Sequence, residues 1–234
     1  MSSRDGSRPD VGVIVVAAGA GVRAGPGEPK QFRPILGVPM LLRAVRPFTS
    51  HPEVAVVVIA VPPGLDARPP EWLARLVGER LALVPGGPSR AHSVRAALSA
   101  LPAAAGVVLV HDGARPFVSR ETIDAVIAKA RAGVGAVAAV PLSDTVKEVV
   151  EGNRISQTVA RERLWRAQTP QGFPRDMIER AYARLANGDA ASDDATLCER
   201  AGLPVEVVPD SASNFKITTA DDFRLAEALA RDVR

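Results

Sequence analysis

The stretch VGVIVVAAGAGVR, residues 11–23, joins an unbroken apolar run to a loop of small residues. An apolar run such as Val11 to Ala17 is typical of a strand that is buried on both faces of a parallel sheet. The small residues after it would let backbone N–H groups approach a phosphate, and the cations Arg23 and Lys30 would neutralise its charge. Open α/β sheets bind ligands beyond the carboxyl ends of their strands. The stretch therefore predicts an α/β sheet with a phosphate site after its first strand.

The glycine pattern of this loop does not match the common nucleotide fingerprints. It lacks the third glycine of G-x-G-x-x-G and the G-K-[ST] of a P-loop. The second predicted strand ends in Ala60 and Val61, so it offers no acidic residue for a ribose. A long loop that reaches Lys30 and carries two cations suits a triphosphate better than a dinucleotide. The alternative is a plain glycine-rich turn with surface cations.

Strands and helices alternate along most of the chain. Apolar runs predict further strands at residues 54–61, 81–84, 106–110, 135–140, 164–167 and 205–208. Helical spacing and capping signals predict helices at residues 39–49, 71–77, 89–101, 120–132, 174–186, 193–201 and 219–230. The last of these helices begins with Thr219 and Asp222, which are close to a capping box. The alternation predicts an α/β fold, a Rossmann-like, mostly parallel, doubly wound sheet with helices on both faces.

The pattern changes at about residues 142–162. Residues 144–150 and 155–159 alternate like two strands around a turn at Gly152 and Asn153, so they predict a protruding β-hairpin arm. The hairpin is mostly polar and buries little within its own chain, and isolated hairpins are marginal in water. We therefore favour an arm that packs on a second copy of the chain over a solvent-exposed flap.

Length and composition fit one globular domain. The 234 residues are 47% hydrophobic and 24% charged, which supplies ample apolar mass for a core. We expect a disordered tail at residues 1–10 and a single domain over residues 11–234. The net charge of +3 is mild and the charged residues are interspersed, so we expect no binding of nucleic acid.

The sequence carries no targeting or redox signal. Residues 1–10 lack the apolar core of a signal peptide, and no run of 18 apolar residues occurs. These features predict a cytoplasmic protein that does not bind a membrane. Cys198 is the only cysteine, which excludes an internal disulfide, and a buried, inert thiol is expected.

A second candidate for the phosphate site is His111-Asp112-Gly113-Ala114-Arg115-Pro116, which follows another predicted strand. Asp112 would lie at the carboxyl end of that strand, and Mg²⁺ is bound by one or two carboxylates plus substrate phosphates. Arg115 would form a fork onto a phosphate. The alternative is an Asp112 that caps a helix and pairs with Arg115. His111 is expected to be packed and hydrogen-bonded, because no second His or Cys stands at metal-ligand spacing.

Two more segments are candidates for the same site. Gly86 and Gly87 expose backbone groups after a predicted strand, and Ser93 offers a hydroxyl that could bind the edge of a base. A helix capped by Ser89 is the alternative. Lys216 stands between apolar neighbours in an extended segment, so its side chain is a candidate to point inward.

Seven motifs occur in a fixed order: A-A-G-x-G-x-R, P-K-Q, G-G-x-x-R-x-x-S-V, H-D-x-A-R-P, D-T-V-K, T-P-Q and N-x-K-I-T. In this order, over Val11 to Ala230, the chain resembles the 2-C-methyl-D-erythritol 4-phosphate cytidylyltransferases of the non-mevalonate isoprenoid pathway. The resemblance implies a nucleotidyltransferase fold, Mg²⁺ as cofactor, and a homodimer joined through the arm. The implied reaction is attack of the methylerythritol phosphate on the α-phosphorus of CTP, with pyrophosphate as leaving group.

The resemblance also implies roles for the residues that match the family's motifs. The catalytic cations would be Arg23, Lys30 and Lys216. The residues that hold CTP would be Ala17, Ala18, Gly19, Gly87 and Ser93. Asp112 would hold the metal. The acceptor would be held by Gly113, Arg115, Thr145, Arg161 and Thr169. Because Thr145 and Arg161 belong to the arm, they would serve the partner's site.

The chain departs from the family's pattern at two places in these motifs. Gly113 stands where Ala is usual, and Pro88, which has no N–H, stands where an acidic or polar residue is frequent. Two alternatives stay open at this stage. One is a cytidylyltransferase for a pentitol phosphate such as ribitol 5-phosphate, and the other is a non-catalytic nucleotide-binding domain on the same fold.

Overall fold

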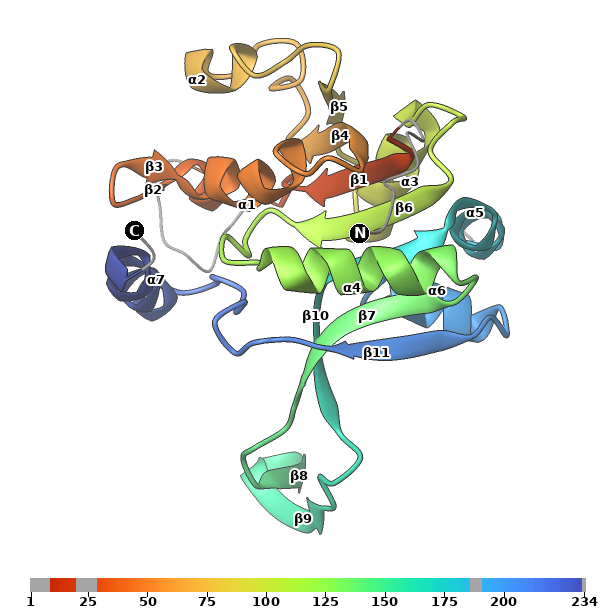
Figure 1. Cartoon of the computed structure of the whole chain (residues 1–234). Coiled ribbons are helices and arrows are strands. Elements are labelled where there is room, and N and C mark those ends of the chain that lie inside the picture. The colour runs from red at the N-terminus through yellow and green to blue at the C-terminus, as the bar shows by residue number, and fades with distance from the viewer. Residues whose placement is uncertain (1–8, 20–28, 186–190, 233–234) are drawn as a thin grey trace, which may run out of the picture.

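The computed structural model describes residues 9–19, 29–185 and 191–232. Its centre is a seven-stranded sheet (Figure 1). The strand order is β11 (Val205–Pro209), β7 (Gly135–Pro141), β10 (Trp165–Pro174), β6 (Val107–Asp112), β1 (Val11–Val16), β4 (Val54–Val61) and β5 (Leu81–Pro85). All of these strands run parallel except β10, which is antiparallel to both β6 and β7. The predicted α/β fold with a mostly parallel sheet is therefore confirmed.

Side chains that alternate along the strands build two separate cores. Val11, Val13 and Val15 of β1 belong to the core under α1 (Met40–Thr49) and α4 (Arg120–Arg131). Ile14 of β1 belongs to the opposite core. That core lies under α3 (Arg90–Ala100), α5 (Arg175–Ala183) and α6 (Asp194–Arg200). Helices thus cover both faces of the sheet, as expected for a doubly wound fold.

The strand order places a crevice between β1 and β6. From β1 the chain winds outward through β4 to β5, and then returns to add β6 on the other side of β1. The loops that follow β1 and β6 therefore diverge at the carboxyl ends of these strands. Open α/β sheets bind ligands at such a point.

Strand β10 is longer than the sequence predicts. We expected a strand only at residues 164–167, but β10 continues to Pro174 and pairs with β6 over residues 171–174. Its ladder with β7 shifts register between Ala167 and Gln171. Pro170 lies inside this segment and has no N–H to donate to a neighbouring strand, so the local sequence argues against a strand here. The strand forms nevertheless because β6 and β7 pair with it on both sides.

The predicted hairpin is present and protrudes from the body of the molecule (Figure 1). Strands β8 (Val146–Val150) and β9 (Arg154–Val159) pair antiparallel. Gly152 and Asn153 in the turn between them both have positive φ, at 72° and 58°. Glycine and asparagine adopt that region more easily than other residues, which explains why the turn forms here.

The remaining elements lie close to the predicted positions. The helix predicted at residues 71–77 is shorter, since α2 spans only Glu71–Ala74. Two short strands, β2 (Pro34–Ile35) and β3 (Val38–Pro39), pair before α1. The tail predicted at residues 1–10 falls mostly outside the described residues, and Asp10 forms an ion pair with Arg131. Within the described ranges, no helix is long and apolar enough to cross a membrane.

The last helix, α7 (Ala220–Asp232), is held by the predicted capping box. The Asp222 carboxylate accepts hydrogen bonds from the Thr218 and Thr219 amides, at 2.7 and 2.8 Å. The Thr219 hydroxyl accepts one from the Asp222 amide at 3.2 Å. Burial opposes ionisation of Asp222, but these hydrogen bonds outweigh it and lower the pKa of the carboxyl. The box thereby fixes the segment directly after Lys216.

We expect Asp222→Ala to lower the free energy of unfolding at pH 7 by about 1 kcal/mol, the usual cost of losing a helix cap. Because folding lowers the pKa of Asp222, its carboxylate stabilises the folded state fully above the unfolded pKa of about 3.9. This stabilisation is lost as the pH falls through the pKa that Asp222 has in the folded protein. Urea unfolding at several pH values measures it. Asp221→Ala is the control, because Asp221 is exposed and pairs with Arg224 on the surface. Equal stability of the two variants at pH 7 would show that the cap contributes nothing.

Candidate active site

A pocket of about 420 Å³ opens at the carboxyl ends of β1 and β6. It is formed by loops from four distant parts of the chain, which the switch in strand order brings together. Its walls include the following residues that the sequence predicted for the site: Ala17, Ala18, Gly19, Lys30, Gly87, Ser93, Asp112, Gly113 and Lys216. The two phosphate-site candidates of the sequence thus lie in one cavity. Arg23 lies outside the described residues.

The start of the first loop is held by backbone and side-chain bonds. The Ala17 amide continues the ladder and donates to the Ala60 carbonyl at 2.8 Å. The buried Gln31 side chain donates to the Ala17 carbonyl, also at 2.8 Å. Lys30 Nζ donates to the Ile217 carbonyl at 3.0 Å, which links this loop to the segment that carries Lys216. The described ends of the loop are therefore both held by hydrogen bonds, and Ala17, Ala18 and Gly19 line the pocket.

Gly86 and Gly87 bring a second loop into close contact with the first. A Cβ added to Gly86 would lie 2.1 Å from the Cβ of Ala18, so only glycine fits at this position. The Ser93 hydroxyl accepts a hydrogen bond from the Gly87 amide at 3.1 Å and donates to the Ser89 carbonyl at 3.0 Å. Ser89 also caps α3, as the alternative interpretation proposed. Ser93 therefore shapes the Gly87 loop and keeps one acceptor lone pair for a ligand.

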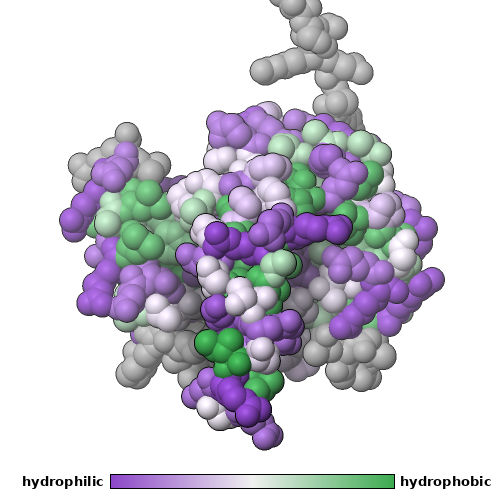
Figure 2. Space-filling view, turned by 90° about the horizontal axis from the view of Figure 1, so that it is seen from below, coloured by the Kyte–Doolittle hydropathy of each residue, from purple (hydrophilic) through white to green (hydrophobic). Residues whose placement is uncertain are grey.

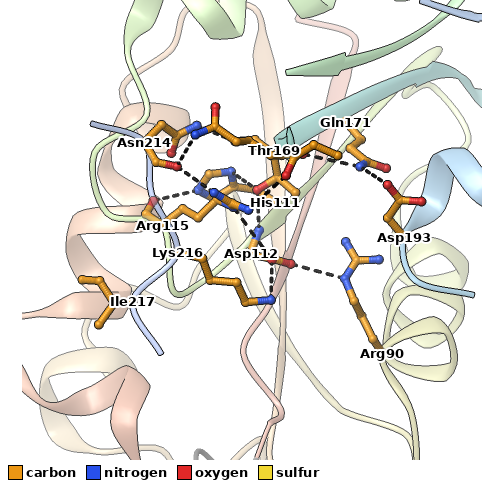
Figure 3. A network of polar contacts seen from close by, with 12 residues as sticks. Arg90, His111, Asp112, Arg115, Thr169, Gln171, Asp193, Asn214, Lys216 and Ile217 are labelled. Atoms are coloured by element: carbon orange, nitrogen blue, oxygen red, sulfur yellow. Dashed lines mark hydrogen bonds and ion pairs between the residues drawn. The ribbon is translucent and has the colours of Figure 1, made fainter. Parts of the chain in front are cut away.

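The Asp112 carboxylate is the electrostatic centre of the pocket. Lys216 Nζ lies 2.8 Å from its Oδ2, and Arg90 Nε lies 3.3 Å from its Oδ1. Figure 3 shows these two cations reaching Asp112 from opposite sides. Arg115 is farther away, at 4.0 Å. Burial raises the pKa of a carboxyl, but the charges of Arg90, Lys216 and Arg115 outweigh it and hold the pKa of Asp112 well below its usual range.

His111 and Thr169 form a buried chain of hydrogen bonds behind Asp112 (Figure 3). His111 Nε2 lies 3.0 Å from the Arg115 carbonyl, which can only accept, so this nitrogen carries the proton. The Thr169 hydroxyl then donates to Nδ1 at 3.0 Å and accepts from the Asp112 amide at 3.0 Å. Burial lowers the pKa of His111 to about 4, so the ring is neutral at pH 7. His111 is packed and hydrogen-bonded, as the sequence predicts.

Arg115 lies mostly inside the protein. Its Nη1 donates to the Asn214 carbonyl at 2.7 Å, and Asn214 in turn donates to the Thr169 carbonyl at 2.8 Å. Its Nε is buried without a hydrogen-bond partner in the described part of the chain. Burial lowers the pKa of Arg115, against the effect of the nearby Asp112 and Asp210 carboxylates. Arg115 thus leaves one buried donor that a ligand or a water molecule would satisfy.

Four residues predicted for acceptor binding do not line this pocket. Thr169 is 3% exposed and its hydroxyl is engaged within the protein. Arg115 stands directly behind the pocket wall. Thr145 and Arg161 belong to the base of the arm, which projects away from the sheet (Figure 1). Within one chain, the structure therefore gathers the described residues predicted for the nucleotide, but of the five predicted acceptor residues only Gly113 lines the pocket.

Sequence reasoning assigned no role to Arg90, Gln31 or Asn214. All three stand inside the G-G-x-x-R, P-K-Q and N-x-K-I-T motifs, so the sequence marked their positions without indicating a chemical role. Asn214 is fully buried and holds Arg115 and Thr169 through groups far away in sequence. Only the folded arrangement reveals these contacts.

The whole described chain is similar to one family of enzymes. Residues 11–232 match the family model of 2-C-methyl-D-erythritol 4-phosphate cytidylyltransferase. The enzyme of that name from Streptomyces avermitilis is 43% identical over 240 residues, covering 96% of this chain and 95% of the relative. The one from Streptomyces coelicolor is 45% identical over 226 residues, covering 92% and 83%.

Solved structures give the same result. The crystal structure of 2-C-methyl-D-erythritol 4-phosphate cytidylyltransferase from Thermus thermophilus matches with a TM-score of 0.80 and 38% identity, over 95% of this chain and 99% of that one. These matches confirm the resemblance that the seven motifs carry.

We expect Gly86→Ala to lower the free energy of unfolding by about 1–3 kcal/mol, because the new methyl group overpacks against Ala18. The displaced Ala18 should also weaken nucleotide binding. Gly78→Ala is the matched control, since a Cβ there meets nothing within 4 Å. Thermal unfolding and calorimetric titration with CTP measure both effects. If Gly86→Ala behaved like Gly78→Ala, the close contact between the two loops would not matter.

Proposed function

The chain belongs to the 2-C-methyl-D-erythritol 4-phosphate cytidylyltransferase family, and we propose that the pocket after β1 and β6 carries out that family's reaction. The chain is a CTP-dependent nucleotidyltransferase. It transfers CMP from CTP to 2-C-methyl-D-erythritol 4-phosphate, which gives 4-diphosphocytidyl-2-C-methyl-D-erythritol and pyrophosphate. The observation that carries the assignment to this pocket is the group of Lys30, Lys216 and Asp112 on its walls.

The reaction requires charge neutralisation more than proton transfer. A phosphate monoester is already a competent nucleophile near neutral pH, so the acceptor needs no enzymic base. The barrier comes from bringing one polyanion onto another and from the charge that develops as pyrophosphate leaves. Catalysis therefore consists of positioning and electrostatic stabilisation of an in-line transition state at the α-phosphorus.

The nucleotide half of the site is assigned to residues near the ends of β1 and β5. Ala17, Ala18, Gly19 and Gly87 offer backbone groups to CTP, with cytosine lying near the Gly87 loop. Ser93 keeps that loop in place and has one free acceptor lone pair toward the base. The tight fit between Ala18 and Gly86 supports this assignment, because it fixes the two loops relative to each other.

The triphosphate and the transition state are assigned to the cations. Lys30 and Lys216 lie on the pocket wall and are joined through the Ile217 carbonyl, which accepts from Lys30 Nζ at 3.0 Å. Arg23 is proposed as the third cation from its place in the A-A-G-x-G-x-R motif. Lys216 is 40% exposed at its side chain, so it can leave Asp112 for an entering phosphate.

Enzymes of this kind generally use a divalent metal, and we assign Mg²⁺ to Asp112. The donor set fits, because an ionised carboxylate on the pocket wall plus phosphate oxygens is the set that Mg²⁺ prefers. When bound, the ion would neutralise and orient the triphosphate. The geometry of His111 excludes it as a base toward the acceptor, since both ring nitrogens are engaged inside the protein.

The acceptor half is assigned to Gly113, Arg115 and Thr169 of one subunit with Thr145 and Arg161 of the partner subunit's arm. Arg115 supplies positive charge and an unsatisfied Nε donor close to Asp112. Thr169 would act mainly by holding the Asp112 amide, because its own donor is used by His111. The arm residues would complete the site in a homodimer.

The arm carries apolar side chains that suit a partner. Val149, Val150 and Ile155 are 52%, 42% and 56% exposed. Figure 2 views the molecule from below, with the arm toward the viewer, and shows hydrophobic surface among polar residues on this face. Exposed apolar groups on a protruding hairpin favour a protein interface over a free flap.

The use of CTP favours a cytoplasmic location, which stays a prediction.

We expect Lys30→Ala and Lys216→Ala each to lower turnover about 10²–10³-fold with little change in stability, since both lysines would stabilise developing charge. Pyrophosphate release from CTP in the presence of methylerythritol phosphate measures turnover, and thermal unfolding checks the fold. Lys129→Ala is the control, because Lys129 pairs with Glu206 on the surface. Near wild-type release by either variant would remove that lysine from the mechanism.

The arm makes a different prediction, because a site shared between subunits can be complemented. Arg161→Ala and Lys216→Ala should each be inactive alone. After the two variants are mixed and allowed to exchange subunits, heterodimers should regain activity, since one of their two sites has an intact lysine and an intact partner arm. No recovery despite verified exchange would mean that each arm serves its own subunit.

Sedimentation tests the dimer itself. We expect a dimer at micromolar concentration and dissociation by Ile155→Asp, which puts a charge on the apolar part of the arm. Leu225→Asp, at a position of similar exposure on α7, should stay dimeric. A wild-type monomer under these conditions would contradict the homodimer.

A further inference from the structure

Asp194 is a fully buried carboxylate that does not line the pocket. It is the first residue of α6 and packs against α3 and α5. Its Oδ1 accepts a hydrogen bond from the Tyr182 hydroxyl at 2.5 Å, and its Oδ2 accepts one from Arg90 Nη2 at 2.8 Å. A charge buried to this degree is costly unless it is paired, so Asp194 requires an explanation.

Helix α6 does not need Asp194 as its cap. The preceding residue, Asp193, fills that position, and its Oδ1 accepts from the Thr196 amide at 3.0 Å. The Asp194 amide is satisfied separately by Gln171 Oε1 at 3.1 Å. The two neighbouring acids therefore have different duties, and the Asp194 carboxylate is directed at Arg90 and Tyr182.

Arg90 connects Asp194 to the pocket. Its guanidinium contacts two carboxylates at once, Asp194 through Nη2 and Asp112 through Nε. Figure 3 shows Arg90 approaching Asp112 from the side opposite to Lys216. Burial opposes the charge on Arg90, but the Asp194 and Asp112 carboxylates outweigh it and raise the pKa of Arg90. The guanidinium is therefore fixed and ionised.

The charges around Asp112 show how Asp194 would affect metal binding. Asp112 faces Arg90, Lys216 and Arg115, and although the Asp210 carboxylate also acts on Arg115, the remaining excess of positive charge would repel a divalent cation. Asp194 places a full negative charge on the far side of Arg90, where little solvent screens it. It thereby offsets one of the three cations without occupying space in the pocket.

We propose that Asp194 is a positioning residue of the metal site: it fixes Arg90 against Asp112 and balances the Arg90 charge, so that Asp112 keeps its affinity for a divalent cation. This role depends on the proposed binding of the metal by Asp112. Partners that hydrogen-bond to a metal-ligating carboxylate set its orientation and the strength of its bond to the metal. The Tyr182 hydroxyl donates a hydrogen bond to Asp194 and thereby helps to orient the Asp194 carboxylate toward Arg90.

The test separates metal binding from nucleotide binding. Mn²⁺ serves as the probe, and its affinity in the presence of saturating CTP is measured by electron paramagnetic resonance. CTP affinity without metal is measured by calorimetry. We expect Asp194→Asn to weaken Mn²⁺ binding about 10–100-fold, the usual effect of losing such a partner. CTP binding without metal should stay equal or become tighter, because the uncompensated Arg90 charge attracts an anion.

Two matched variants make the outcome specific. Tyr182→Phe keeps the Asp194 charge and should weaken Mn²⁺ binding far less. Asp193→Asn removes the neighbouring negative charge but keeps a capping side chain, because asparagine accepts the same bond from the Thr196 amide, so it should leave Mn²⁺ affinity near wild type. A parallel loss of CTP and Mn²⁺ affinity in Asp194→Asn would indicate a structural role and overturn the proposal, as would unchanged Mn²⁺ affinity.

If Asp194→Asn does not fold, Arg90→Lys decides the matter. Lysine keeps the charge but has no planar fork to join two carboxylates. It should therefore weaken Mn²⁺ binding while CTP binding persists, and wild-type Mn²⁺ affinity would overturn the proposal.

Asp112→Asn tests separately whether Asp112 holds the metal. If Asp112→Asn binds Mn²⁺ like wild type, Asp112 is not the metal ligand. If Asp112→Asn loses Mn²⁺ but the Asp194 and Arg90 variants keep it, only the proposed role of Asp194 is wrong.

Discussion

The ionised Asp112 carboxylate is the constraint on which the rest of the site depends. It lies at the end of a fully buried strand, so its charge is stable only where cations replace the lost water. Those cations come from three separate segments: Arg90 begins α3, Arg115 follows β6, and Lys216 precedes α7. Because one carboxylate binds all three, the crevice between β1 and β6 acquires a fixed set of charges before any substrate enters. The site is in this sense organised in advance for a polyanion.

Local signals were sufficient for much of this arrangement. The apolar run at residues 11–17 predicts β1 because a short run of this kind is typical of a strand buried inside a parallel sheet. Thr219 and Asp222 predict the start of α7, and their reciprocal hydrogen bonds are present. The apolar neighbours of Lys216 made it a candidate to point inward, and its ammonium does contact Asp112. Each of these signals depends on residues that are close in sequence, where propensity and capping decide the structure.

What the sequence could not predict depends on contacts between distant residues. β10 continues through a segment whose proline argues against a strand, because β6 and β7 offer it partners on both sides. Thr169 matches a family motif and was expected to touch the acceptor, but its hydroxyl is engaged by His111 and the Asp112 amide. Asp194 has no local signal at all, since its partner Arg90 lies 104 residues away. Motifs locate such residues, but only packing shows which atoms remain available to a substrate.

The two halves of the site differ in how completely one chain builds them. The proposed nucleotide half is joined by contacts within the chain, since the Gly86 loop contacts Ala18 and the Lys30 ammonium contacts the Ile217 carbonyl. In the proposed acceptor half, Arg115 and Thr169 already form hydrogen bonds with protein groups, and the buried Nε of Arg115 has no hydrogen-bond partner among the described residues. A phosphorylated polyol needs several donors that remain exposed until it arrives. A polar hairpin from a second subunit would supply them, and this role would account for an arm built from a segment so poor in core-forming residues.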